Sequence, residues 1–179
     1  ALNLVQNYST KKIRRLFAGE VILAGAFRQI NMMGINVVDK TDDSVKVRCI
    51  LVSVSDKTGL EEFIPGLLAL NPDMKILSTG GTFNKIAEFL EDGPRSCLTQ
   101  VSDYTGQPET QGGLVKTLDF KIYLGLLTET YNDRHKADLD RTGALPIDMV
   151  VANLYPFSET ISKTGVSVEQ ARGNIDIGG

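Results

Sequence analysis

The sequence predicts an α/β fold with a mainly parallel sheet and helices on both of its faces. Apolar runs of strand length alternate with segments in which apolar residues recur at helical spacing. Such alternation is typical of parallel sheets, because each parallel connection needs a crossover. Polar, glycine-containing stretches follow several of the apolar runs. Ligands bind beyond the carboxyl ends of strands in these folds, so we expect the functional site at those stretches.

The regular pattern begins at Val45. Residues 45–54 form the first predicted strand, and the next segment has the apolar stripe of a helix from Leu60 to Leu68. Pro65 lies within this stripe and lacks a backbone N–H, so we expect it to kink or shorten the helix. Residues 74–77 form the second predicted strand.

A second amphipathic segment follows and is predicted to form a helix with its apolar face between Phe83 and Leu90. Glu91-Asp-Gly-Pro94 should end it, since glycine and proline commonly terminate helices. Residues 96–101 form the third predicted strand. Residues 102–113 contain three glycines and a proline, which indicates a long polar loop of the kind that often carries function.

The C-terminal part of the pattern is less uniform. Residues 117–127 are ambiguous, whereas 134–141 predict a short helix and 167–174 a last helical turn or two. The continuous apolar run at 147–154 predicts a strand buried on both faces. We therefore expect two parts, an N-terminal extension over residues 1–44 and an α/β domain over residues 45–179.

Composition excludes several classes of function. The 179 residues are 42% hydrophobic and 23% charged with a net charge of −3, so nothing favours nucleic acid, and no apolar stretch is long enough to span a membrane. The N-terminus does not have the pattern of a signal peptide. Cys49 and Cys97 lie far apart, which predicts two buried, reduced thiols and a cytoplasmic protein. His135 is the single histidine and is expected to be a solvated helix residue, so the sequence offers little support for a His-based metal site or a Ser-His-Asp triad.

Two polar turns predict an anion site. Ser53-Val-Ser-Asp-Lys-Thr-Gly59 and Ser78-Thr-Gly-Gly-Thr82 each lie between a predicted strand and a predicted helix. The first N–H groups of a helix lack internal partners and attract anions. The pair of turns therefore predicts a phosphorylated small molecule as the ligand.

Six motifs occur in an order that resembles one family. They are Ser-Val-Ser-Asp-Lys-Thr-Gly-Leu (53–60), Ser-Thr-Gly-Gly-Thr (78–82), Val-Ser-Asp-Tyr-Thr-Gly (101–106), Val-Lys-Thr-Leu (115–118), Asn-Leu-Tyr-Pro-Phe (153–157) and Ile-Asp-Ile-Gly-Gly (175–179). From position 49 to its end, the sequence resembles the inosine monophosphate (IMP) cyclohydrolase domain. That domain is the N-terminal half of the bifunctional purine-biosynthesis enzyme that also carries AICAR transformylase.

The resemblance implies a methylglyoxal-synthase-like three-layer fold and a reaction without a cofactor or a metal. This reaction is the ring closure of 5-formyl-AICAR (FAICAR) to IMP with loss of water. The carboxamide nitrogen attacks the formyl carbon, so a proton acceptor is needed near that nitrogen. An oxyanion develops on the formyl oxygen, so a cation or preorganised donors are needed there.

The resemblance also assigns roles to residues of this sequence. It implies that Lys116 stabilises the oxyanion, and that Tyr155 and Asp176 handle or orient protons. The implied substrate-binding and phosphate-binding residues are Ser53, Ser55, Lys57, Ser78, Gly80, Gly81, Thr82, Thr117, Asn153, Gly178 and Gly179.

The sequence departs from the family pattern at several positions. Leu114 stands where the family has an arginine, Asp119 and Tyr123 replace two histidines, and Leu124 replaces a glycine. If the Asp119 carboxylate faces the phosphate, it weakens binding. A further family lysine, which follows the last motif, has no counterpart in the sequence. These departures leave a second interpretation open, a weak or inactive purine-nucleotide-binding module of the same fold; methylglyoxal synthase itself is a more distant one.

The expected partner is a small purine nucleotide, FAICAR or IMP, with neither nucleic acid nor membrane. The sequence leaves the role of residues 1–44 and the oligomeric state open. A homodimer and a separate AICAR transformylase partner are both compatible with it.

Overall fold

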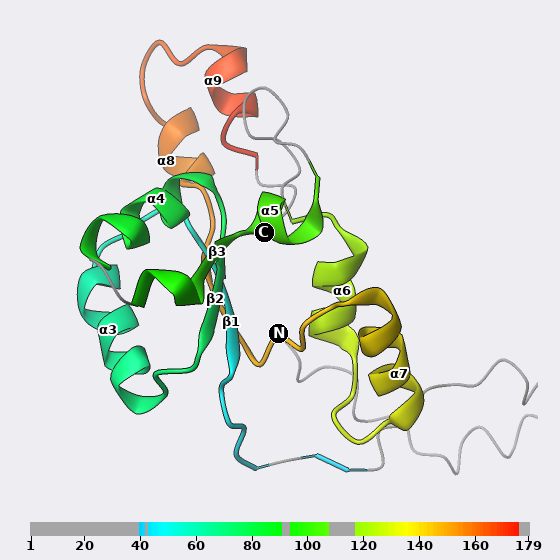
Figure 1. Cartoon of the computed structure of the whole chain (residues 1–179). Helices are drawn as coiled ribbons and strands as arrows, with labels where there is room; N and C mark the ends of the chain where they lie inside the picture. The colour runs from blue at the N-terminus through cyan, green and yellow to red at the C-terminus, as the bar shows by residue number, and fades with distance from the viewer. Residues whose placement is uncertain (1–39, 42, 91–93, 108–116, 176–179) are drawn as a thin grey trace, which may run out of the picture. The chain divides into compact units, whose positions relative to one another are not determined.

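The structure is a computed structural model that describes residues 40–41, 43–90, 94–107 and 117–175 (Figure 1). Residues Lys40–Gly179 form one compact unit by their internal contacts. The predicted extension over residues 1–44 lies almost entirely outside the described residues, so its role and the boundary at residue 45 stay predictions.

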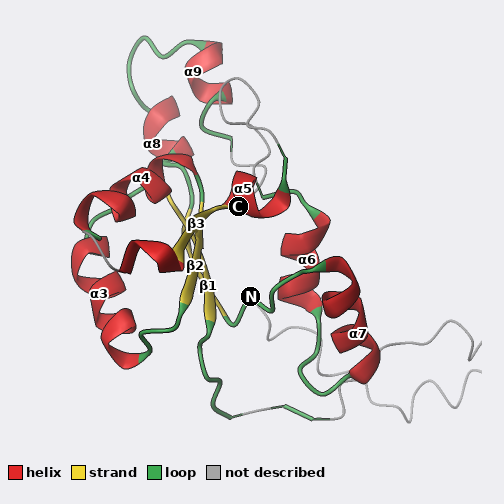
Figure 2. Ribbon diagram, viewed as in Figure 1, coloured by secondary structure: helices red, strands yellow, loops and turns green. Residues whose placement is uncertain are grey.

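A four-stranded parallel sheet forms the centre of this unit (Figure 2). Its strands are β1 (Cys49–Val54), β2 (Lys75–Ser78), β3 (Leu98–Gln100) and β4 (Met149–Asn153). The spatial order is β3-β2-β1-β4, with each neighbouring pair parallel. The predicted α/β class with a parallel sheet is confirmed, and all carboxyl ends of the strands lie at one edge.

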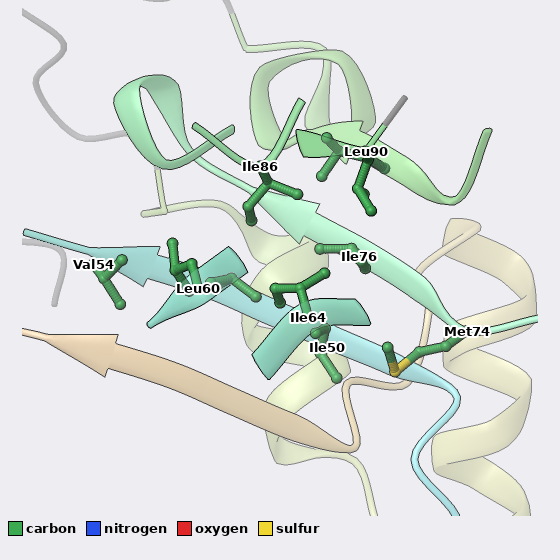
Figure 3. Packing of buried hydrophobic residues seen from close by; sticks show 10 residues of the cluster. Ile50, Val54, Leu60, Ile64, Met74, Ile76, Ile86 and Leu90 are labelled. Atoms are coloured by element: carbon green, nitrogen blue, oxygen red, sulfur yellow. The ribbon is translucent and has the colours of Figure 1, made fainter. Parts of the chain in front are cut away.

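One face of the sheet is covered by α3 (Leu60–Leu70) and α4 (Gly80–Phe89). The alternate residues Ile50, Val52 and Val54 of β1 point to this face, since side chains of a strand alternate between its two faces. They pack with apolar residues of the two helices and neighbouring segments, as Figure 3 shows. The other buried members of this cluster are Leu60, Ile64, Met74, Ile76, Ile86, Leu90 and Leu98.

The opposite face is covered by α5 (Val101–Thr105) and α6 (Phe120–Leu127). Cys49, Leu51 and Leu77 of the sheet pack there against Val101 and Ile122. α7 (Asp133–Thr142) follows α6 on the same side of the sheet (Figure 1). Helices on both faces make β1 and β2 the best-buried strands of the domain.

The remaining elements are short. A 3-10 helix, η1 (Pro94–Cys97), precedes β3, and α8 (Phe157–Ile161) and α9 (Val168–Arg172) follow β4. α9 begins with a capping box between Ser167 and Gln170. The predicted helical turns at 167–174 and the predicted helix at 134–141 are therefore confirmed.

The prediction that 147–154 is buried on both faces is wrong. β4 lies at an edge and pairs with β1 alone among the described strands. Val150 is 50% exposed, and Ala152 and Asn153 are exposed as well. The described residues cover only one face of the strand, since Met149 and Val151 pack against the main core whereas the alternate residues Val150 and Ala152 are exposed.

Several boundaries also differ from the predictions. Residues 101–105 form α5 where a polar loop was expected, and Gly106 ends this helix in a left-handed conformation with φ 78°. The helix α3 continues through Pro65 to Leu70 and is not shortened. The first strand begins only at Cys49, and the ambiguous stretch before α7 contains α6.

The single histidine is not simply solvated. His135 lies in α7 and is half-buried, and its Nδ1 accepts a hydrogen bond from the backbone N–H of Glu129 at 3.0 Å. The imidazole thus holds the connection between α6 and α7. Of the two cysteines, Cys49 is buried and Cys97 only partly buried, and both thiols are free.

Candidate functional site

A tight turn connects β1 to α3 at the carboxyl edge of the sheet. Gly59 precedes α3 with φ 81°, a conformation that disfavours any residue with a Cβ. Asp56 organises the turn, since its Oδ1 accepts hydrogen bonds from Thr58 N at 3.0 Å and Thr58 Oγ1 at 2.7 Å. The turn therefore has a fixed shape before any ligand arrives.

These bonds give a prediction for Asp56. Its pKa lies below the ordinary value of 3.8, chiefly because the Thr58 backbone N–H stabilises the carboxylate and secondly because the Thr58 hydroxyl does. The resulting stabilisation of the fold is present above pH 3.8 and is lost as the pH falls through the lowered pKa. Thr58→Ala removes only the hydroxyl bond, so the Asp56 pKa should move part of the way back up. NMR titration of the Asp56 carboxyl carbon measures this, and an unchanged midpoint would contradict the assignment.

The second turn connects β2 to α4. Thr79 is the N-cap residue, and Gly80 has φ 29°, which again favours glycine. The N–H groups of Thr82 and Phe83 donate to Thr79 O at 2.9 Å each. The amides of Gly80 and Gly81 come before these first helical bonds, so they are the natural donors for an anion at the positive end of α4.

Side chains join the two turns directly. Ser53 Oγ and Thr79 Oγ1 share a hydrogen bond of 2.9 Å. A Cβ placed on Gly81 would lie 3.7 Å from Lys57 Cε and 4.0 Å from Lys57 Nζ. The ammonium of the first turn therefore lies beside the helix start of the second, and one anion can be contacted by both.

Backbone carbonyl groups hold the Lys57 ammonium in place. Lys57 Nζ donates to Ser55 O at 3.0 Å and, more weakly, to Val54 O at 3.4 Å. An ammonium has three protons, so a third remains for a ligand. Lys57 is partly exposed, which leaves that proton accessible from solvent.

Asn153 connects the end of β4 to the first turn. Its Oδ1 accepts hydrogen bonds from Ser55 N at 2.6 Å and Asp56 N at 3.0 Å, and its Nδ2 donates to Asp56 O at 2.8 Å. Three strand ends, those of β1, β2 and β4, thus contribute to one constellation. The sequence predicted that these stretches would meet but not how they are joined.

Two of the predicted phosphate-binding hydroxyls point into the protein. Ser78 is fully buried, and its Oγ donates to Val52 O at 2.9 Å. Thr82 is also buried; its Oγ1 accepts from Val54 N at 3.1 Å and donates to Val54 O at 3.0 Å. Both side chains tie β1 to the β2–α4 connection, whereas Ser53 and Ser55 are partly exposed at the site.

The other predicted site residues are less defined. Lys116, Asp176, Gly178 and Gly179 lie outside the described residues. Thr117 is partly buried, and its carbonyl accepts a hydrogen bond from Asp119 N at 3.0 Å. Tyr155 follows β4 at the same edge and is 51% exposed. The roles that the resemblance assigns to these residues stay predictions.

The departure at Asp119 has a structural explanation. Asp119 is 6% exposed and is the N-cap of α6, with its Oδ1 accepting from Lys121 N at 2.8 Å. Its charge is used within the protein at a helix N-terminus, where a carboxylate is favourable. Lys121 Nζ in turn donates to Tyr104 O at 3.1 Å, which ties the start of α6 to α5. An aspartate directly before an apolar helical stretch is a capping signal that the sequence already contained.

A depression of about 330 Å³ lies away from this constellation, at the opposite end of the strands. It is lined by Arg48, Cys49, Asp73, Lys75, Leu145 and Pro146. Burial raises the pKa of the Cys49 thiol to about 11, so this thiol stays protonated and unreactive at neutral pH. Among the described residues, no cluster of three His, Cys, Asp or Glu side chains could hold a metal ion, and no described helix has the length and apolar character needed to cross a membrane.

The family model for the MGS-like domain matches residues 59–179. The chain belongs to the MGS-like domain family. This family assignment agrees with the parallel sheet flanked by helices, and the fold implied by the sequence resemblance is confirmed.

Relatives of this MGS-like domain include proteins named "Bifunctional purine biosynthesis protein PurH". The one from Prochlorococcus marinus (strain NATL2A) is 53% identical over 131 residues, which are 72% of this chain and 24% of that protein. The one from Bacillus mycoides (strain KBAB4) is 49% identical over 129 residues, again 72% and 24%. The chain thus spans about a quarter of the length of these relatives. A solved structure titled "Crystal structure of ForH" superposes with a TM-score of 0.59 at 27% identity, covering 73% of this chain and 62% of that one.

Proposed function

We propose that this MGS-like domain acts in purine biosynthesis as an IMP cyclohydrolase, which closes the ring of FAICAR to give IMP and water. The observation that carries the proposal is the close approach of the two turns. Lys57 lies beside Gly81, and the hydroxyls of Ser53 and Thr79 are hydrogen-bonded to each other. The names of the relatives support the pathway.

The paired turns would hold the 5′-phosphate of the nucleotide. The amides of Gly80 and Gly81 offer donors at the N-terminus of α4, and the Lys57 ammonium supplies a full positive charge. A phosphate anchored at this edge would orient the reacting atoms several ångströms away, so binding energy is converted into positioning.

The ring closure itself needs few groups. The carboxamide nitrogen forms a bond to the formyl carbon, and the formyl oxygen takes up the negative charge. The bond between this carbon and oxygen then breaks, and the oxygen leaves as water with one proton from the carboxamide nitrogen and one from the formamide nitrogen. Lys116 would stabilise the oxyanion, and Tyr155 and Asp176 would accept or deliver protons, as the family resemblance implies.

The direct test is to mix the purified chain with FAICAR and follow the formation of IMP. Turnover clearly above that of a Lys116→Ala control would support the proposal. The absence of turnover, together with binding of IMP in a titration, would instead support a weak or inactive nucleotide-binding module.

The departures from the family pattern favour this second candidate. Leu114 cannot make the bidentate contacts of the family arginine, and Tyr123 stands where a histidine is expected. Tyr123 is 44% exposed on α6. A site without its usual cations can retain nucleotide affinity while losing most of its rate.

Leu114→Arg tests whether this departure weakens the site. If the missing guanidinium limits the site, IMP affinity or the rate of IMP formation should rise by about tenfold or more, in line with a charge-assisted hydrogen bond to a phosphate. Isothermal titration with IMP and the cyclisation assay measure the two quantities. Leu114→Lys is the matched control, because it adds the same charge without the planar fork, and equal gains in both variants would show that charge alone is responsible.

A further inference from the structure

Hydrogen bonds within the protein occupy most of the donors and acceptors of the Asn153 side chain. Its amide oxygen has two lone pairs, and both accept backbone N–H groups, those of Ser55 and Asp56. Its amide nitrogen has two protons, and one is donated to Asp56 O. The oxygen therefore has no acceptor capacity left, and a single N–H remains for any ligand.

The family resemblance implies that Asn153 binds the substrate, and these three bonds give its side chain a structural role as well. The three bonds join residues about a hundred positions apart, and all of them end on the backbone of residues 55 and 56. They hold both the backbone N–H and the backbone carbonyl of Asp56, which a contact with a ligand would not require. Lys57 follows directly, so the direction in which the chain leaves Asp56 sets where the ammonium lies.

The bonds also decide which amides can meet an anion. The N–H groups of Ser55 and Asp56 are consumed by Asn153, and that of Thr58 by the Asp56 carboxylate. The donors that these bonds leave for an anion include the Ser55 hydroxyl, the Lys57 ammonium and the amides at the start of α4. Each of the first two is held in position by the segment that Asn153 ties down.

We propose that Asn153 is a positioning residue, which clamps the Ser55–Asp56 backbone so that Lys57 is held beside Gly81 for anion binding. The proposal rests on the proposed function, because it names how one part of the same site is held. In this proposal the edge strand β4 contributes to the phosphate site through its last residue, Asn153, which holds the first turn in place.

The test uses Asn153→Ala in the full chain. We expect the backbone amides of Ser55 and Asp56 to exchange with solvent at least tenfold faster by NMR, and the dissociation constants for IMP and for inorganic phosphate to rise by about tenfold. Asn71→Ala is the matched control. It also removes an asparagine bond to a backbone carbonyl, Asn71 Nδ2 to Val47 O at 2.8 Å, but at the opposite end of the sheet. It should leave the two amides and both affinities unchanged.

The possible outcomes distinguish the positioning role of Asn153 from the proposed nucleotide function. Unchanged exchange of the two amides in Asn153→Ala would overturn the clamp, whatever happens to binding. Faster exchange with unchanged affinity for both ligands would overturn the positioning role. If the unmodified chain binds neither IMP nor phosphate, the proposed function fails and the positioning role fails with it, while the exchange data still test the three hydrogen bonds.

Discussion

Replacing Lys116 by alanine is expected to lower the rate of IMP formation by at least about a hundredfold. A positioned cation that meets a developing oxyanion contributes on this order, because it acts on charge that exists only in the transition state. The Michaelis constant should change much less than kcat, because the proposed function assigns the phosphate to the two turns and the oxyanion to Lys116. Steady-state kinetics with FAICAR measure both constants, and the thermal midpoint checks that the fold is retained.

Lys85→Ala is the matched control for this experiment. Lys85 lies on α4 and forms a surface ion pair with Glu88 at 3.1 Å, so its loss removes the same charge without touching the turns. It should leave kcat nearly unchanged, because Lys85 belongs to neither turn and an exposed ion pair contributes little to the stability of the fold. A Lys116→Ala variant as active as Lys85→Ala would remove Lys116 from the mechanism.

Replacing Gly125 by alanine is expected to lower the free energy of unfolding by about 2–4 kcal/mol, the range of a severe overpacking defect. A Cβ at Gly125 would collide with the carbonyl oxygen of Leu145 and lie 3.0 Å from two side-chain carbons of Ile147. The backbone cannot move away easily, since Gly125 O accepts a hydrogen bond from Ile147 N at 2.9 Å. Denaturant unfolding followed by circular dichroism measures the change.

Gly66→Ala provides the comparison, because a Cβ there meets nothing within 4 Å in the middle of α3. Alanine is the better helix former, so this variant should be neutral or more stable by up to about 1 kcal/mol. Equal losses in the two variants would show that the close approach of α6 to the Leu145–Ile147 segment is not what requires glycine. The same contact explains why glycine is retained at position 125, next to Leu124.

The order of the four strands and of α3, α4, α7 and α9 could be predicted from the sequence, because the apolar periodicity changes with each of these elements. The burial of β4 could not, since an apolar run shows that a segment has surface to bury but not how many neighbours it has. The short helix α5 was missed because Ser102 and Asp103 look like loop residues. Gly106, which ends α5 in a left-handed conformation, was the available signal.

The candidate site could be predicted in part. Hydroxyl and glycine residues after two strands indicated the paired turns, and the structure brings these turns together. The inward direction of Ser78 could have been predicted from strand alternation, because it shares a face with the buried Ile76. The hydrogen bonds of Asn153 could not, since they join segments about a hundred residues apart.

The exposed position of β4 has a consequence for how the affinity responds to temperature. Opening of an edge strand with one neighbour requires less free energy than unfolding of the whole domain. Each opening would release the Ser55–Asp56 backbone, so that Lys57 is no longer held for anion binding. The measured dissociation constant equals the intrinsic one divided by the fraction of molecules that can bind. Under the proposed function, nucleotide affinity should therefore fall on warming before the buried centre of the sheet unfolds. The temperature dependence of the dissociation constant would then measure the fraction of molecules in which β4 has locally opened.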